Sequence, residues 1–300
     1  MNEDIQNDII KRKSRKALIV GMVTAFTVFV ILGVVFGLGM WLGGKDRRDG
    51  ASESEHKHVP KHGDRKELTL PGGATMAMIY VAPGSFMMGS PSTEEGREDD
   101  ETQHRVTLTK GYWLGETEVT QAQWESVMGI NPSRFKGASR PVECVSWNDC
   151  QAFIAIVNRE ARRQFGGEFR LPTEAEWEYA CRAGSKGSYA GTGKLDDMGW
   201  CSDNSGEQTH EVKGKEANAW GFYDMHGNVL EWCQDWYGEY QSGAVTDPTG
   251  SASGDARVLR GGCWDGGARF CRSADRGRLR PGVCYDYYGF RLACSVGPRD

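Results

Sequence analysis

The chain has 300 residues, of which 39% are apolar and 26% charged; this is ordinary for a globular protein and excludes wholesale disorder. Glycine is abundant at 40 residues but has no three-residue period, which excludes collagen, and ten tryptophans favour an ordered, loop-rich domain. The net charge is −5; residues 1–43 contain five Lys or Arg and three Asp or Glu, so the remainder carries −7. That charge excludes a nucleic-acid domain that works by neutralising phosphates, and we expect no nucleic-acid partner.

Residues 17–43 contain no charge and are rich in Val, Ile, Leu and Phe. A bilayer core needs about 20 such residues. The hydrophobic core of a cleaved signal is shorter, about 7–15 residues, and precedes a small-residue cleavage site that is missing here. The stretch therefore predicts a retained transmembrane helix that partners the membrane.

Five basic residues precede this span and three follow it. This bias favours a cytoplasmic basic tail at 1–16 and a periplasmic or extracellular main domain. Residues 44–68 are polar and charged, which predicts a flexible linker. The remaining residues, 69–297, show no internal break and predict a single domain.

The predicted elements of this domain begin with strands at 76–81 and 85–88, joined by a Pro83-Gly84 turn. Three capping patterns then predict helix starts, at Thr120-x-x-Gln123, Ser146-x-x-Asp149 and Thr173-x-x-Glu176. Glycines are expected to end the first helix near residue 129 and the third at residue 184. The later chain predicts only short strands, such as 257–259 and 290–294. The fold class is therefore α+β with much irregular structure.

Eight sequence blocks follow one another in a distinctive order. They are PGSFMMGS at 83–90, EVTQ at 118–121, PVE and VSW within 141–147, RLPTEAEWEYA at 170–180, GFYDMHGNV at 221–229, EW at 231–232, RGG at 260–262 and GFR at 289–291. Together they resemble the formylglycine-generating enzyme (sulfatase-modifying factor) family over about residues 70–295. The resemblance implies a loop-rich fold related to C-type lectins, with a small twisted antiparallel sheet and about two main helices.

Enzymes of this family oxidise a sulfatase cysteine to formylglycine, using O₂ and a copper ion bound by two cysteines. The position of the first copper ligand matches Gly266, and the segment for the second is shortened before Cys271. Cu(I) prefers two converging thiolates, so the copper site of the family is not matched. A copper site rebuilt around Cys263 is the remaining candidate for catalysis.

The resemblance also implies disulfides. Cys181 and Cys271 match one family pair, and Cys150 and Cys294 form a second candidate pair, each displaced slightly from the family's position. Such bonds suit an extracytoplasmic domain. Because nine cysteines is an odd number, at least one thiol stays free.

A structural calcium site is implied by the GFYDMHGNV and EW blocks. The ligands would be the side chains of Asp224 and Glu231 and the backbone carbonyls of Gly227 and Val229. Hard oxygen ligands of this kind suit Ca²⁺. The alternative is that Asp224 stabilises a turn and Glu231 forms an ordinary ion pair. A second family calcium site would fall near Asn204-Ser205.

Residues 264–288, here called the contact segment, interleave family positions with fourteen others, none of which is Lys, Glu, Gln, Met or Trp. Those are residues that adenine mutagenesis of an AAC or AAT codon cannot produce. The segment therefore resembles the variable region of lectin-fold proteins diversified by retroelements, and its Tyr, Gly and Asp suit adaptable binding loops. Ordinary drift in surface loops is the alternative. The predicted contact residues are Trp264, Asp265, Phe270, Arg278, Arg280, Tyr285, Asp286, Tyr287 and Tyr288.

Two functions remain open. The leading hypothesis is a membrane-anchored, extracytoplasmic module that binds a protein or peptide ligand through the contact segment. The rival is an oxidase that converts a substrate cysteine to formylglycine at an altered metal site. A purely structural envelope protein is a third possibility.

Overall fold

A computed structural model describes residues 59–296. The predicted tail 1–16, the predicted membrane span 17–43 and residues 44–58 of the predicted linker lie outside that range. Within the described range, no helix is both long and apolar enough to cross a membrane.

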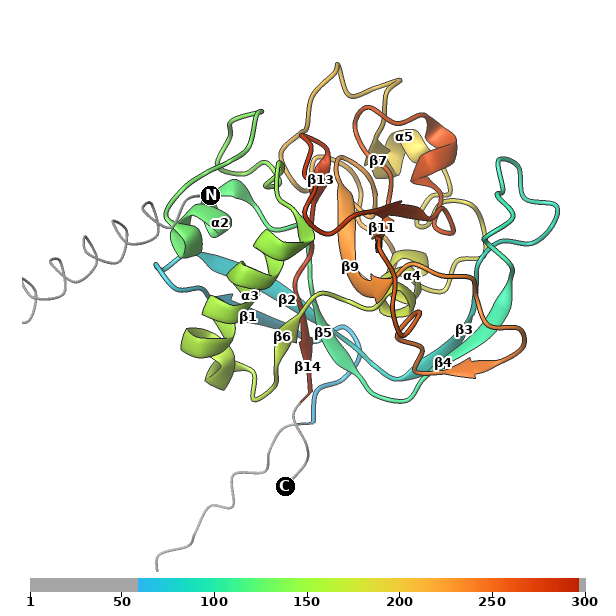
Figure 1. Ribbon diagram of the computed structural model, residues 1–300, viewed down its shortest axis with the longest axis horizontal. Coiled ribbons are helices and arrows are strands. Elements are labelled where there is room, and N and C mark those ends of the chain that lie inside the picture. Colours follow the sequence, from blue (N-terminus) through green and yellow to red (C-terminus); the bar gives the residue numbers. More distant parts are fainter. Residues whose placement is uncertain (1–58, 297–300) are drawn as a thin grey trace, which may run out of the picture. The chain divides into compact units, whose positions relative to one another are not determined.

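The main sheet has five antiparallel strands in the order β1-β2-β5-β14-β6. Strand β14 lies between β5 and β6, so the end of the domain is built into the interior of the sheet (Figure 1). The strands are β1 (Arg65–Thr69), β2 (Thr75–Val81), β5 (Tyr112–Gly115), β14 (Ala293–Ser295) and β6 (Phe169–Arg170).

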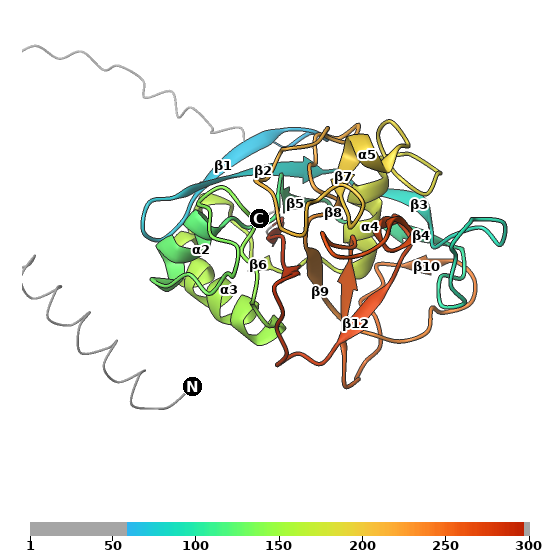
Figure 2. The same cartoon turned by 90° about the horizontal axis from the view of Figure 1, so that it is seen from above.

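Both faces of this sheet are covered, because successive side chains of a strand point to opposite sides. On β2, Met76, Met78 and Tyr80 join one apolar cluster, whereas Ile79 and Val81 join another. The first cluster contains residues of α2 (Gln121–Met128) and α3 (Trp147–Ala161); the second contains residues of α4 (Glu174–Arg182). Figure 2 shows α2 and α3 together, away from α4. The sheet therefore separates two hydrophobic cores.

The three predicted helices begin where the capping patterns place them. Thr120, Ser146 and Thr173 each accept a hydrogen bond from the backbone three residues later, and each residue at that later position bonds back. Helix α2 ends at Gly129 as predicted, but α4 ends at Ala183, which takes a left-handed φ of 46° one residue before the predicted Gly184. Shorter helical turns are α5 (Leu195–Met198), η1 (Arg162–Gln164) and η2 (Ala268–Cys271).

Three smaller sheets complete the domain, and the predicted α+β class is confirmed. The four-stranded sheet has the order β12-β11-β9-β13, the three-stranded sheet β10-β4-β3, and the third sheet pairs β7 with β8. Their strands are β3 (Gly84–Met88), β4 (His104–Leu108), β7 (Gly199–Trp200), β8 (His226–Gly227), β9 (Leu230–Trp236), β10 (Val245–Thr246), β11 (Arg257–Arg260), β12 (Gly277–Leu279) and β13 (Tyr288–Gly289). The strand expected at 290–294 begins later, at Ala293.

The predicted linker boundary at residue 68 needs correction. Strand β1 begins at Arg65 and pairs with β2 along its whole length, and Leu68 is completely buried. The sequence looked like a linker because β1 is an edge strand, where charged and exposed side chains such as Lys66 and Glu67 are common. The folded domain therefore includes the last residues of that stretch.

The Ser146 capping box yields a stability prediction. Replacing Ser146 with Ala leaves the backbone N–H of Asp149 without its hydroxyl partner, now at 3.2 Å. The free energy of unfolding should fall by about 1 kcal/mol, measured by urea denaturation. Ser146→Thr keeps a capping hydroxyl and should retain most of the wild-type stability, and Ser253→Ala on an exposed loop serves as the control. Equal stabilities for S146A and S253A would contradict the assignment.

Candidate functional site

The middle of the contact segment is attached to the domain by a buried arginine. The Arg272 guanidinium lies 2.9 Å from a carboxylate oxygen of Glu94 and 2.8 Å from one of Glu101. Arg272 is 2% exposed and Glu101 is fully buried. Burial would raise the pKa of Glu101, but its hydrogen bonds from Arg272 and Ser90 leave that pKa below its usual value. These two residues therefore form a charged pair inside the protein.

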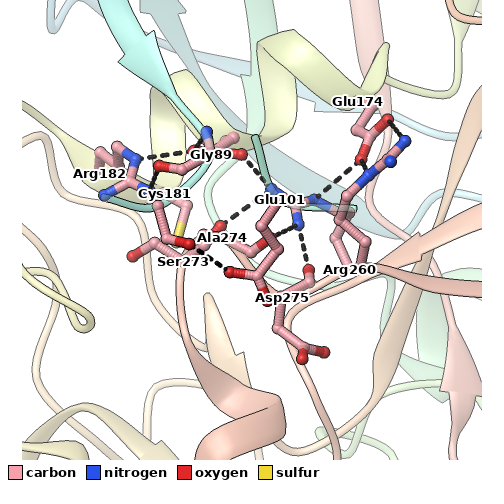
Figure 3. A network of polar contacts seen from close by, with 12 residues as sticks. Gly89, Glu101, Glu174, Cys181, Arg182, Arg260, Ser273, Ala274 and Asp275 are labelled. Atoms are coloured by element: carbon pink, nitrogen blue, oxygen red, sulfur yellow. Dashed lines mark hydrogen bonds and ion pairs between the residues drawn. The ribbon is translucent and has the colours of Figure 1, made fainter. Parts of the chain in front are cut away.

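Arg260, at the end of β11, fixes the backbone of the same stretch. Its guanidinium donates to the carbonyl oxygens of Ser273, at 2.9 Å, and Ala274, at 2.8 Å, and pairs with the carboxylate of Glu178 on α4. Figure 3 shows Arg260 directed at this stretch of backbone. Because a side chain here bonds main-chain carbonyls, residues 273 and 274 keep their course whatever side chains surround them.

Arg276 provides the third attachment. It forms a bidentate ion pair with Glu174 at the start of α4, with N···O distances of 2.7 and 2.9 Å.

The turn before the contact segment requires glycine. Gly262 has a φ of 73°, and a Cβ there would lie 2.6 Å from the sulfur of Cys271. Glycine in the RGG block therefore lets the backbone pass close to Cys271 at the end of η2.

The predicted contact residues lie on either side of these buried attachments and differ in their exposure. Asp265, Phe270, Arg278, Arg280 and Tyr285 are exposed, and Asp286 and Tyr287 are half-buried. Trp264 and Tyr288 are buried, at 7% and 8% exposure, so their placement on the contact surface was wrong. Large aromatic rings in this loop are anchors as well as contacts, a distinction that sequence alone does not make.

Trp264 supports the end of the contact segment from beneath. Its indole N–H donates to the carbonyl of Asp286 at 3.0 Å, and its ring packs edge-on against Phe135. In the same stretch of chain, the rings of Tyr285 and Tyr287 are nearly parallel with centroids 5.5 Å apart. Arg134, outside the segment, pairs with Asp286 and was not predicted. It could not have been predicted, because nothing in the sequence links residues so far apart.

Position 266, where the family has a copper ligand, is close to one sulfur. A Cβ added to Gly266 would lie 3.5 Å from Sγ of Cys263. Burial raises the pKa of Cys263 to about 11, and it raises that of neighbouring Cys271 well above the usual value. Both thiols are therefore protonated at neutral pH. Across residues 59–296, no group of three or more His, Cys, Asp or Glu side chains could hold a metal ion by itself.

The structure describes all nine cysteines as thiols, so the predicted pairs Cys181–Cys271 and Cys150–Cys294 stay predictions. Cys181 lies beside Ser273 (Figure 3), and its thiol contacts the carbonyl of Met225 and Nε2 of His226, each at 3.8 Å; burial raises its pKa to about 12. Cys271 packs instead with Leu195 and Cys201.

The predicted calcium residues surround a buried carboxylate cluster. Asp224 accepts a hydrogen bond from the backbone of Lys213 through one oxygen, and its other oxygen is buried without a partner. Glu231 accepts bonds from Arg291 and from the indole of Trp177 through both oxygens. Gly227 and Val229 lie on the buried turn between them.

A third carboxylate, Glu118, was missed by the sequence analysis although it lies in the EVTQ block. It is fully buried and accepts hydrogen bonds from the Asn228 side chain and the Val229 backbone. Burial, then Asp224 and Glu231, raise its pKa well above the usual value, and burial raises the pKa of Asp224 to about 6. Three buried carboxyls share the charge of Arg291, and the unpartnered oxygen of Asp224 is the one free acceptor among them, the kind of oxygen ligand that a hard divalent cation accepts.

Two cavities lie away from the contact segment's exposed side chains. One of about 770 Å³ lies under the loop after β9 and is lined by Asp235, His104 and Arg276 among others; burial raises the pKa of Asp235 to about 8. The other, of about 570 Å³, is lined by β3, the end of α4 and Trp220. None of the nine predicted contact residues lines either cavity. Of the contact segment, only the buried attachment Arg276 lines one of these two cavities.

Comparison with known proteins identifies the domain. Residues 68–296 match the sulfatase-modifying factor enzyme 1-like domain. The chain belongs to this family. It is 36% identical over 202 residues to the formylglycine-generating enzyme of Streptomyces coelicolor, covering 61% of this chain and 60% of that protein. Treponema denticola variable protein 1 shares the fold, with a TM-score of 0.70 and 35% identity over 77% of this chain and 99% of its own.

Serine/threonine-protein kinase Pkn1 of Chlamydia caviae is also similar, at 31% identity over 263 residues and 78% of this chain. The chain spans about 40% of the length of that relative. The family therefore includes proteins named for different activities, and membership alone does not determine the function of this domain.

Substitutions at the buried attachment residues and at the exposed contact residues should change the free energy of unfolding by very different amounts. Arg272→Gln leaves buried Glu101 and half-buried Glu94 without their cation, which should lower the free energy of unfolding by about 3–5 kcal/mol. Arg280→Ala on the exposed surface should change it by less than about 0.5 kcal/mol. Urea denaturation of both variants measures the difference, and similar losses for the two would contradict the division into anchors and contacts.

Proposed function

We propose that residues 59–296 form a binding module for a protein or peptide ligand, with a contact surface made by the exposed side chains of the contact segment. The observation that carries this proposal is the division of that segment into buried attachments and exposed side chains. Arg272 and Arg276 are held by carboxylates inside the domain, whereas Asp265, Arg280 and Tyr285 face solvent. A surface of this kind accepts substitutions without loss of the fold.

Three further points support binding over oxidation. The copper ligand position is Gly266, and nearby Cys263 and Cys271 are buried thiols with raised pKa values, whereas Cu(I) favours thiolates. Tyr285 is exposed and Tyr287 half-buried, and tyrosine supplies rigid contact area at little entropic cost. The Treponema denticola relative is itself named a variable protein. In this proposal residues 17–43 anchor the module in the membrane, with the domain outside the cytoplasm.

Selection from a random peptide library displayed on phage tests the proposal. Peptides enriched on the purified chain should lose binding to a Tyr285→Ala, Tyr287→Ala double variant by at least about tenfold, because aromatic anchors dominate interface energy. Met87→Ala and Ile130→Ala, at exposed apolar residues elsewhere, provide the control. Peptides that bind the double variant and wild type equally would contradict the proposal.

The oxidase alternative rests on the sulfur of Cys263 near position 266, and one assay separates it from binding. The chain, supplied with Cu(I) and O₂, is mixed with a Cys-x-Pro-x-Arg peptide, and aldehyde is measured by mass spectrometry. We expect none. Aldehyde that forms with wild type and not with Cys263→Ser would establish the oxidase and overturn the binding-only function.

We further propose that Ca²⁺ binds at Asp224, Glu118 and the carbonyls of Gly227 and Val229, with Glu231 retained by Arg291. Without the ion, a carboxyl whose folded pKa is raised stabilises the fold only while it is protonated, so stability should fall as the pH rises from about 4 through about 6. Added Ca²⁺ should raise the melting temperature at pH 7 in the chelator-treated chain. Asp224→Asn should abolish the calcium response and reduce the pH dependence, part of which remains because the pKa of Glu118 is also raised; a calcium response that survives this change would contradict the site.

A further inference from the structure

Two of the nine cysteines differ from the rest in their exposure. Cys144 is half-buried and Cys284 is exposed, whereas the other seven are buried. All nine lie within residues 59–296. Thiol exchange requires access to a small oxidant, so these two are the first candidates for it. Cys144 follows the PVE block, and Cys284 belongs to the contact segment.

Backbone hydrogen bonds place these two cysteines on neighbouring stretches of chain. The N–H of Cys144 donates to the carbonyl of Tyr285 at 3.0 Å, and the N–H of Asn148 donates to that of Pro281 at 3.2 Å. Cys284 adjoins Tyr285, and the charge of Cys284 contributes to the raised pKa of Cys144, so the two thiols lie near each other on these adjacent stretches. A disulfide between them requires their Cα atoms to come within about 4.4–6.8 Å.

Cys144 also has an unusual conformation. Its φ is 60°, in the left-handed region that non-glycine residues rarely occupy. The preceding residue is held firmly: Glu143 is fully buried, its N–H donates to the hydroxyl of Ser133 and its carboxylate accepts from the N–H of Phe135 at 2.8 Å. A residue that its surroundings hold in a sparsely populated backbone conformation indicates a functional position.

We propose that Cys144 and Cys284 form a reversible disulfide that joins the contact segment to the stretch before α3. The oxidant is a small-molecule disulfide such as oxidised glutathione. One thiolate attacks it and releases one glutathione, giving a mixed disulfide; the second cysteine then displaces the other glutathione. The two protein thiols are oxidised to one disulfide, and their two protons end on two glutathione thiols.

The bond would close a loop of about 140 residues, which constrains the unfolded chain strongly. It would also hold Tyr285 and Asp286 in place, so the state of the thiols would control how rigid this part of the contact surface is. Burial and the carboxylates of Glu143 and Asp286 raise the pKa of Cys144 to about 12, and burial and Asp149 raise that of Cys284. Thiolates are therefore scarce at neutral pH, and exchange should quicken at higher pH.

The test uses the full chain purified in detergent. One sample is incubated with oxidised glutathione at about pH 8.5 and another with dithiothreitol. Remaining thiols are alkylated after denaturation, and digests are read by mass spectrometry. We expect a cross-linked peptide containing Cys144 and Cys284 only in the oxidised sample, with two fewer alkylated cysteines. The melting temperature should rise by about 5–10 °C on oxidation.

Cys284→Ser removes an exposed sulfur at little cost to folding, and it should abolish the cross-link and the rise in melting temperature. Cys294→Ser, at a cysteine outside the proposed pair, should retain both. If Cys144 and Cys284 are fully alkylated after oxidation, or Cys284 is found joined to another cysteine of the chain, the proposal is wrong. Binding of library peptides is not needed for this test, so it stands apart from the proposed function.

Discussion

The structure depends on arginines that are buried with their carboxylate partners beneath the contact segment. Placing a guanidinium in the protein interior costs several kcal/mol, and the cost is offset only when every donor finds an acceptor. Arg272 and Arg276 meet that condition with Glu101 and Glu174 as ion-pair partners, and Arg260 pairs with Glu178 although its Nε lies 3.7 Å from Glu174 without a hydrogen bond. The backbone of residues 271–276 is therefore fixed from inside the domain. Side chains that point outward on either side can differ without disturbing it.

The elements that the sequence predicts well are those with local causes. The three capping boxes depend on residues three positions apart, and all three helices begin where expected. Strand β1 was misread as linker because its only cue is its pairing with β2, which a charged edge strand does not reveal. The fold class follows from these elements and from the eight blocks together.

The candidate site was predicted less completely, for a physical reason. Positions matched along the chain do not establish contacts when a loop is shortened. Trp264 and Tyr288, predicted as contact residues, are buried. Glu118 completes the carboxylate cluster with Asp224 although more than 100 residues separate them in the chain. The fold brings such neighbours together, and no spacing of residues in the sequence predicts their contact.

The two halves of the contact segment are held by different forces, which bears on how the surface can vary. Residues 271–276 rely on ion pairs with residues outside the segment. The stretch at 281–288 relies on backbone hydrogen bonds and on ring contacts, in which Tyr285 stacks on Tyr287 and Tyr288 meets Tyr287 edge-on; all three are predicted contact residues. A change at these tyrosines therefore alters the support of the loop as well as its contacts. A covalent link from Cys144 to Cys284 would separate the two roles, because the loop would then keep its place independently of the aromatic side chains it carries.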